Sequence, residues 1–109
     1  MIELRENVTV TADAAGRAVA TLQPLRAFES WRIRGITVAS TSTTSIPEAR
    51  VYRGSESPSS LVDGTFTGTL DHSSVTVELH NGERLICVWS GVDVGAQCSL
   101  TIQGERVIQ

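Results

Sequence analysis

The chain has 109 residues, the usual size of one domain, and its 9 basic and 12 acidic residues give a net charge of −3. Every basic residue is an arginine, and no lysine occurs in the chain. The absence of lysine excludes a lysine-containing phosphate-binding loop, a lysine Schiff base and an isopeptide cross-link made by the chain's own lysine. The mild acidity argues against nucleic-acid binding as the main role, because neutralising phosphates requires clustered positive charge.

The composition favours β structure. Val, Ile and Thr account for 31 of the residues, and β-branched side chains suit pleated sheets better than helices. No stretch approaches the roughly 20 apolar residues of a membrane span, and the first residues lack the basic and apolar regions of a secretion signal. We therefore expect an all-β chain without a membrane-spanning segment.

Alternation of apolar and polar residues predicts a series of short strands. In chain order they are 7–12, 17–22, 31–40, 47–53, a distorted stretch at 61–70, 74–79, 84–89 and 96–103. Seven to eight strands at intervals of roughly 8–12 residues are typical of an antiparallel sandwich. The prediction is one β-sandwich domain over residues 1–109, jelly-roll-like or immunoglobulin-like, with arms at 1–6 and 105–109.

The strand at 31–40 changes phase in its middle. Trp31 and Ile33 share one phase, Ile36 and Val38 share the other, and the switch falls at Gly35. A one-residue β-bulge at Gly35 would keep all four apolar side chains facing the core, and glycine is the natural residue for it.

Two turn signals predict hairpins. The segment 13–16 (DAAG) predicts a turn that pairs strands 7–12 and 17–22. Asn81-Gly82 is a strong signal for a short hairpin. The apolar run that follows, 85–89, predicts a central strand that is covered on both sides.

Cys87 and Cys98 would lie directly opposite each other if Trp89 paired with Ala96 across a last hairpin, within reach of a strained disulfide. We favour the alternative of two reduced, buried cysteines that act as small apolar residues. The two histidines match no zinc spacing, so neither a metal nor any other cofactor is predicted.

Four arginines are candidates for an interface. Arg32 and Arg34 share one strand face, and Arg50 or Arg53 could join them in a positive stripe that docks on an acidic partner. Arginine is enriched at protein interfaces. The alternative, which we favour, is an ordinary solvated face of an antiparallel sheet.

The aromatic residues are few. Trp31 and Trp89 lie in phase with core positions, so we expect both to be structural. Phe66, flanked by threonines in a glycine-containing stretch, is the best candidate for an exposed aromatic and a further interface residue.

Asp71 and His72, with Ser73 and Ser74 beside them, provide the residue types of a catalytic triad. Adjacent residues rarely give triad geometry, and no nucleophile elbow between a strand and a helix is present. We therefore expect no catalytic residues here.

Four groups of residues, in this order and spacing, resemble one protein family. They are 24–31 (PLRAFESW), 51–54 (VYRG), 61–65 with 67–69 (LVDGT, TGT), and 82–85 with 88–91 (GERL, VWSG). The combination resembles a family of small uncharacterised proteins of tailed bacteriophages and prophages of high-GC Gram-positive bacteria, over about residues 22–104. The resemblance implies a virion structural protein encoded among head and tail genes, and it assigns no catalytic residues. The first 20 or so residues match nothing in this family.

The pattern and the resemblance together predict a non-enzymatic virion protein, assembled in the host cytoplasm. Capsid decoration or cement is the first expectation, with another head- or tail-associated role second, in many symmetric copies. The expected partners are the chain itself and a major capsid or tail protein, with neither nucleic acid nor membrane. The alternative is a carbohydrate- or receptor-binding module on the particle, which needs exposed aromatics beside polar side chains in a concave patch. A small hydrolase, the third class, would need His72 within hydrogen-bond reach of a serine or cysteine.

Overall fold

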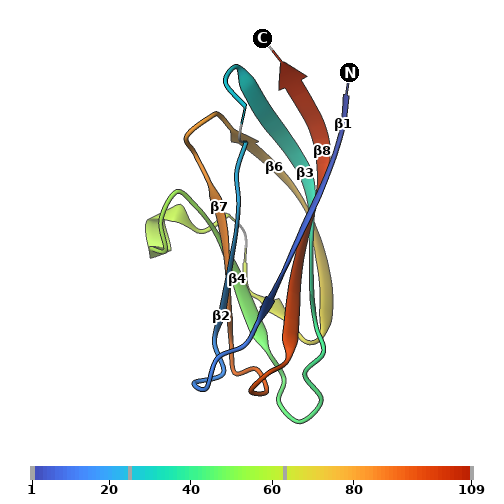
Figure 1. Cartoon of the computed structure of the whole chain (residues 1–109), viewed down its shortest axis with the longest axis vertical. Coiled ribbons are helices and arrows are strands. Elements are labelled where there is room, and N and C mark those ends of the chain that lie inside the picture. Colours follow the sequence, from blue (N-terminus) through green and yellow to red (C-terminus); the bar gives the residue numbers. More distant parts are fainter. Residues whose placement is uncertain (1, 25, 63, 109) are drawn as a thin grey trace.

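The computed structural model describes residues 2–24, 26–62 and 64–108. Within them the chain forms eight strands and one short 3-10 helix (Figure 1). In chain order these are β1 (Ile2–Thr11), β2 (Ala18–Leu22), β3 (Glu29–Ser40), β4 (Glu48–Arg53), η1 (Pro58–Ser60), β5 (Phe66–Thr67), β6 (Leu70–Leu79), β7 (Leu85–Ser90) and β8 (Gln97–Ile108). The distorted stretch predicted at 61–70 therefore contains β5 and the start of β6, and its Asp63 lies outside the described residues.

The strands form two four-stranded antiparallel sheets that pack face to face (Figure 1). Sheet A has the order β1-β8-β3-β6, and sheet B has the order β2-β7-β4-β5. The pairing is nested, because β1 pairs with β8, β2 with β7, β3 with β6 and β4 with β5. A long hairpin rolled into two sheets in this way is an eight-stranded jelly roll. The predicted β-sandwich is confirmed. Of the two predicted forms, jelly-roll-like and immunoglobulin-like, the strand order matches the jelly roll.

Both predicted hairpins are wrong, although both turns form. Gly16, at φ 73°, donates its N–H to the Asp13 carbonyl over 3.0 Å, and Gly82, at φ 93°, lies between β6 and β7. Each turn carries the chain from one sheet to the other, since β1 and β6 belong to sheet A and β2 and β7 to sheet B. Turn residues determine a local reversal of the backbone. They do not determine which sheet the next strand joins.

The predicted β-bulge is confirmed. The register of β3 with both of its neighbours shifts between Ile33 and Gly35. Against β8 the extra residue is Arg34, whereas against β6 the single Arg34 faces two residues, Val75 and Thr76. The apolar side chains on either side of the bulge are all buried: Trp31, Ile33, Ile36 and Val38. One strand therefore keeps its core contacts through a change of phase.

The core lies between the two sheets, and β7 crosses its centre. β7 runs between β2 and β4 in sheet B, as predicted. Its inward side chains Leu85, Cys87 and Trp89 are buried. On its outward face Ile86 is also buried, whereas Val88 is half-buried, so the expected cover on the second side is partial.

The prediction of free arms at the two ends of the chain is wrong, because the described residues of both segments belong to strands of sheet A. Residues 2–6 form the first half of β1 and pair with the end of β8, beginning with Ile2 opposite Arg106. Leu4 points inward and is buried, which ties this segment to the core. Met1 and Gln109, the outermost residues of the two predicted arms, lie outside the described residues.

The molecule is elongated, with extents of 45 × 24 × 22 Å. At one end, here called the loop end, lie the connections 12–17, 41–47 and 91–96 (Figure 1). At the other, here called the terminal end, lie the start of β1, the end of β8 and the connections between β2 and β3 and between β6 and β7 (Figure 1). No helix in the described part of the chain is long and apolar enough to cross a membrane.

Candidate interaction surface

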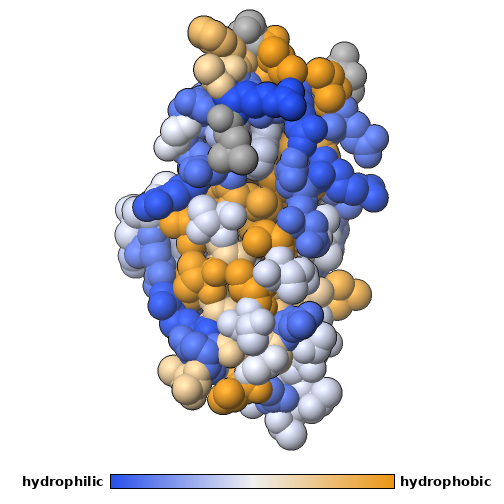
Figure 2. Space-filling model, viewed as in Figure 1, coloured by the Kyte–Doolittle hydropathy of each residue, from blue (hydrophilic) through white to orange (hydrophobic). Residues whose placement is uncertain are grey.

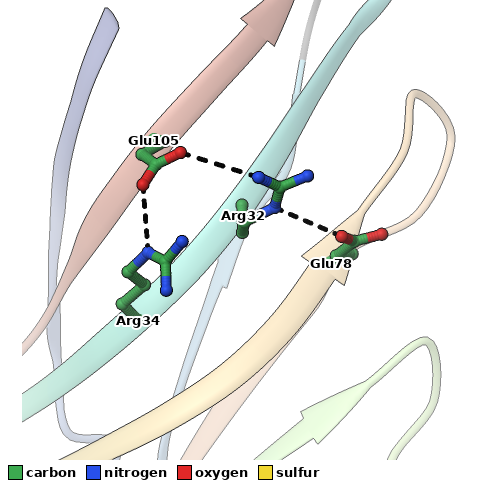
Figure 3. A network of polar contacts seen from close by, with 4 residues as sticks. All are labelled: Arg32, Arg34, Glu78 and Glu105. Carbon is green, nitrogen blue, oxygen red and sulfur yellow. Dashed lines mark hydrogen bonds and ion pairs between the residues drawn. The ribbon is translucent and has the colours of Figure 1, made fainter. Parts of the chain in front are cut away.

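The outer face of sheet A carries the two arginines predicted to share a strand face. Arg32 Nε lies 3.3 Å from Glu78 Oε1 on β6, and Arg32 Nη1 lies 3.7 Å from Glu105 Oε2 on β8 (Figure 3). Arg34 Nε lies 3.1 Å from Glu105 Oε1. Glu105 therefore bridges both arginines, and its side chain is only 17% exposed.

This network neutralises the predicted positive stripe, because two glutamates face two arginines. Exposed ion pairs of this kind contribute about 0.2–1 kcal/mol each, since water screens them. Glu105 fixes the orientation of Arg34 by holding its Nε, and the other carboxylate oxygen of Glu105 faces Arg32 (Figure 3). The face is a solvated sheet surface with a neutral ion-pair network.

Arg50 and Arg53 do not join Arg32 and Arg34, because β4 lies in sheet B. Arg50 Nε donates to Thr65 Oγ1 at 3.5 Å, and Arg53 Nη2 lies 2.8 Å from Glu83 Oε2. The N–H of His80, with the Arg53 guanidinium, holds the pKa of Glu83 below its usual value. Strands β3 and β4 follow each other in sequence but belong to opposite layers, which the local pattern does not reveal.

Phe66 is buried, so its prediction as an exposed aromatic is wrong. It pairs with Ala49 on β4 and its side chain joins the core. Trp31 and Trp89 are buried, as predicted. The exposed aromatic is Phe28, which is 74% exposed and has φ 64°. It lies in the segment 23–30, for which the alternation of apolar and polar residues predicts no strand.

An open hollow of about 370 Å³ lies on sheet A beside the ion-pair network. Gly35 and His72 both line it, and the absence of a side chain at Gly35 lets the His72 ring lie close to β3, since a Cβ added there would lie 3.2 Å from Cε1 of that ring. Arg5, Arg34 and Gln103 line the same hollow. Its chemistry suits one anionic or hydrogen-bonding group of a partner, although Glu3 in the lining weakens the attraction for an anion.

Asp71 and His72 lie on β6 and do not have the geometry of a triad. Nδ1 of His72 is hydrogen-bonded to Oγ1 of Thr37 at 2.8 Å. The Asp71 carboxylate accepts the backbone N–H groups of Thr67 at 3.1 Å and His72 at 2.8 Å. Asp71 therefore holds the backbone, whereas the acid of a triad orients the imidazole ring.

Cys87 and Cys98 are not cross-strand neighbours, because β7 and β8 belong to different sheets. Both are free and fully buried. Burial raises the pKa of both thiols, and Cys98 raises that of Cys87 further. The two residues thus act as small, unreactive core residues. The described residues contain no group of three or more histidine, cysteine or acidic side chains that could hold a metal ion.

At the loop end, the carboxylate of Asp93 ties two loops together, which no sequence motif indicated. It accepts the backbone N–H groups of Thr43 at 2.7 Å, Thr44 at 2.9 Å and Ser45 at 3.1 Å. The hydroxyl of Thr44 donates to it at 2.6 Å. These hydrogen bonds hold the pKa of Asp93 well below its usual value, and the bond from the Thr44 hydroxyl has the largest effect on it. The run of serines and threonines at 40–45 is therefore an ordered loop.

The ordered loops present two aliphatic side chains to solvent. Ile46 is 77% exposed and Val94 is 70% exposed. Ile46 follows the segment bound to Asp93, and Val94 follows Asp93 itself. The loop 12–17 is hydrogen-bonded to the loop 91–96. The N–H of Val92 donates to Gly16 O at 3.1 Å, and the N–H of Gly95 donates to Ala12 O at 3.2 Å. The loop end is thus a hydrogen-bonded platform that displays apolar side chains.

At the terminal end, Arg106 lies between two glutamates on the inner face of sheet A. It is paired with Glu6, and its Nε lies 3.4 Å from Glu29 Oε1. These residues line a pocket of about 240 Å³ together with Trp31, whose Nε1 is buried without a hydrogen-bond partner among the described residues. The two adjacent glutamates offset the charge of Arg106, and Arg26 also lines this pocket.

Comparison with known proteins gives little further information. No protein-family model and no curated protein matches the chain. A chain in the structure of infectious bursal disease virus Gx strain shares 15% identity at a TM-score of 0.26, over 92% of this chain and 32% of that one. A family two carbohydrate esterase from Cellvibrio japonicus shares 17% identity at a TM-score of 0.28, over 94% of this chain and 35% of that one. This chain spans about a third of each, and a likeness at this level carries no functional argument.

Proposed function

We propose that the chain is a non-enzymatic structural protein of a bacteriophage virion that binds other particle proteins in many copies. The capsid surface, as decoration or cement, is the first position proposed, and a tail or connector position is the second. The family resemblance of residues 22–104 supports the class of protein.

The observation that carries the proposal is the loop end. Ile46 and Val94 are strongly exposed, yet their loops are held by the Asp93 carboxylate. A surface that is already ordered loses little conformational entropy on docking, so its apolar contacts contribute more fully to affinity. An ordered apolar platform of this kind suits a protein partner.

The alternative, a carbohydrate- or receptor-binding module, has less support. It needs exposed aromatics, but Phe66, the one predicted to be exposed, is buried, as are Trp31 and Trp89. Phe28 is exposed, but one aromatic on its own offers a sugar a single stacking contact.

The test is binding of the purified chain to the other particle proteins, scored by pull-down and by incorporation into particles. The double variant Ile46→Asp with Val94→Asp places two charges on the platform. We expect it to fold normally, because both side chains are exposed, and to lose at least about tenfold in affinity, as for central interface residues.

The matched control is Phe28→Asp, which changes an equally exposed apolar residue at the terminal end. We expect this variant to bind as the wild type does. Equal binding by the double variant, or the absence of any particle protein that binds the wild type, would overturn the proposal.

A further inference from the structure

The β1 edge of sheet A is unprotected in this structure. β1 keeps an unbroken register with β8 from Ile2 to Thr11, so it is long and regular. The opposite edge strand, β6, has a register shift facing the bulge in β3. In sheet B the edge strands β2 and β5 have only five and two residues.

Backbone groups along β1 are directed outward for pairing. The N–H of Ala12 donates to the Ala96 carbonyl at 2.8 Å, continuing the β1–β8 register. Because bonding direction alternates along an antiparallel pair, the even-numbered residues of β1 bond to β8. The odd-numbered ones, Glu3, Arg5, Asn7, Thr9 and Thr11, therefore direct their N–H and C=O groups away from the sheet.

The usual devices that block such an edge are weak here. Natural edge strands are protected by lysine, proline, bulges or inward-pointing charge. β1 has no proline and the chain has no lysine. The one inward charge, Glu6, is paired with Arg106. From Asn7 to Thr11 the strand is uncharged and rich in β-branched residues, a composition that favours further strand pairing.

An apolar band accompanies this edge. The side of the molecule that shows β1 and β2 has hydrophobic surface between hydrophilic margins (Figures 1 and 2). Val8 and Val10 of β1 and Leu22 of β2 pack against the core but remain partly exposed. A strand added to β1 would cover part of this surface as well as complete the hydrogen bonds.

We infer that β1 pairs with β1 of a second copy, antiparallel and about a two-fold axis, so that two copies of sheet A form one continuous sheet. Such an interface is self-complementary, because the same residues of each copy offer the free backbone groups.

Charge and hydrogen-bond phase select the register. Odd residues must face odd residues for the free backbone groups to meet. Placing Arg5 opposite Arg5, or Glu6 opposite Glu6, brings like charges together and is unfavourable. Placing Asn7 opposite Asn7 sets Arg5 against Thr9 and Glu3 against Thr11. Of the registers that avoid opposed like charges, this one pairs the longest stretch, with about ten hydrogen bonds.

The first measurement is the solution mass of the full chain. We expect about 23 kDa, twice the 11.7 kDa of one chain. A monomer mass at concentrations up to about 1 mM would overturn the inference, because a dimer with a Kd of even about 1 mM would be detected there. The inference does not rest on the proposed function. Ile46→Asp with Val94→Asp should leave the dimer intact, and a dimer that binds no particle protein would overturn only the proposed function.

The second measurement tests the register by cross-linking. In the inferred dimer the two Asn7 Cα atoms lie about 5.5 Å apart, a separation that a disulfide spans. Asn7→Cys should therefore form a covalent dimer on mild oxidation, and the native cysteines should not interfere because they are fully buried. The control is Thr76→Cys, exposed on the opposite edge strand. Equal cross-linking of the two variants, or none in Asn7→Cys, would contradict the register.

The third measurement blocks the edge. Thr9→Pro removes an N–H that points outward, so it should break the dimer while sparing the β1–β8 hydrogen bonds. We expect a monomer with unchanged far-ultraviolet circular dichroism, and a folded variant that still dimerises would exclude pairing at β1. If this variant fails to fold, the cross-linking result decides the inference.

Discussion

At the scale of single residues, Asp93 joins two loops of the loop end through its side chain. Its carboxylate meets three consecutive backbone N–H groups and the hydroxyl of Thr44. Hydrogen bonds to a charged carboxylate favour the ionised form, which is why its pKa is lowered. The order of the loop end therefore depends on one ionised group.

Asp93→Asn should loosen the loop end, because an amide oxygen replaces the carboxylate as acceptor. The folded-state pKa of Asp93 is depressed, so its stabilisation is complete above the unfolded-state value of about 3.9 and is lost as the pH falls below it. Thermal unfolding from neutral pH to pH 2 should show the variant less stable at neutral pH, with the difference shrinking below pH 4. A constant difference across that range would contradict this role of the charge.

At the scale of elements, β1 is a structural strand rather than an arm. It covers the β8 side of sheet A, and Leu4 places its side chain in the core with 1% exposure. Deleting residues 1–6 would remove this cover, so loss of assembly in such a truncation could not be separated from loss of folding.

Leu4→Ala tests the role of β1 directly. We expect it to lower the free energy of unfolding by about 2–5 kcal/mol, the usual cost of truncating a buried leucine. Glu3→Ala, the exposed neighbour, should change it by less than about 0.5 kcal/mol. Urea denaturation measures both values, and similar small effects for the two variants would show that the start of β1 is not packed in solution.

At the scale of the whole molecule, the jelly roll joins segments that are far apart in sequence. Ile2 pairs with Arg106 and Ala18 with Trp89. The first strand therefore lies beside the last strand, and the second beside the seventh. The same topology separates β3 from β4 and β7 from β8 into opposite layers. Both failed pairings, of the arginines and of the cysteines, have this cause.

This topology predicts slow folding. Strands far apart in sequence must lose the entropy of the intervening chain before their contacts form, so folding is slow. All-β sandwiches fold in milliseconds to seconds. Stopped-flow fluorescence should follow the process well, because Trp31 and Trp89 are both buried. Folding in microseconds, as for small helical bundles, would contradict the arrangement of strands.

The sequence by itself determined the central parts of most strands, the bulge at Gly35 and the burial of Trp31 and Trp89. Those features follow from periodicity within one strand, which acts over a few residues. Only the tertiary structure decided that Glu105 neutralises Arg32 and Arg34, that Asp93 orders the 43–45 loop, and that β1 is left as an open edge. Each of these depends on which distant strands and loops become neighbours, and that choice is made by packing of the whole core rather than by local pattern.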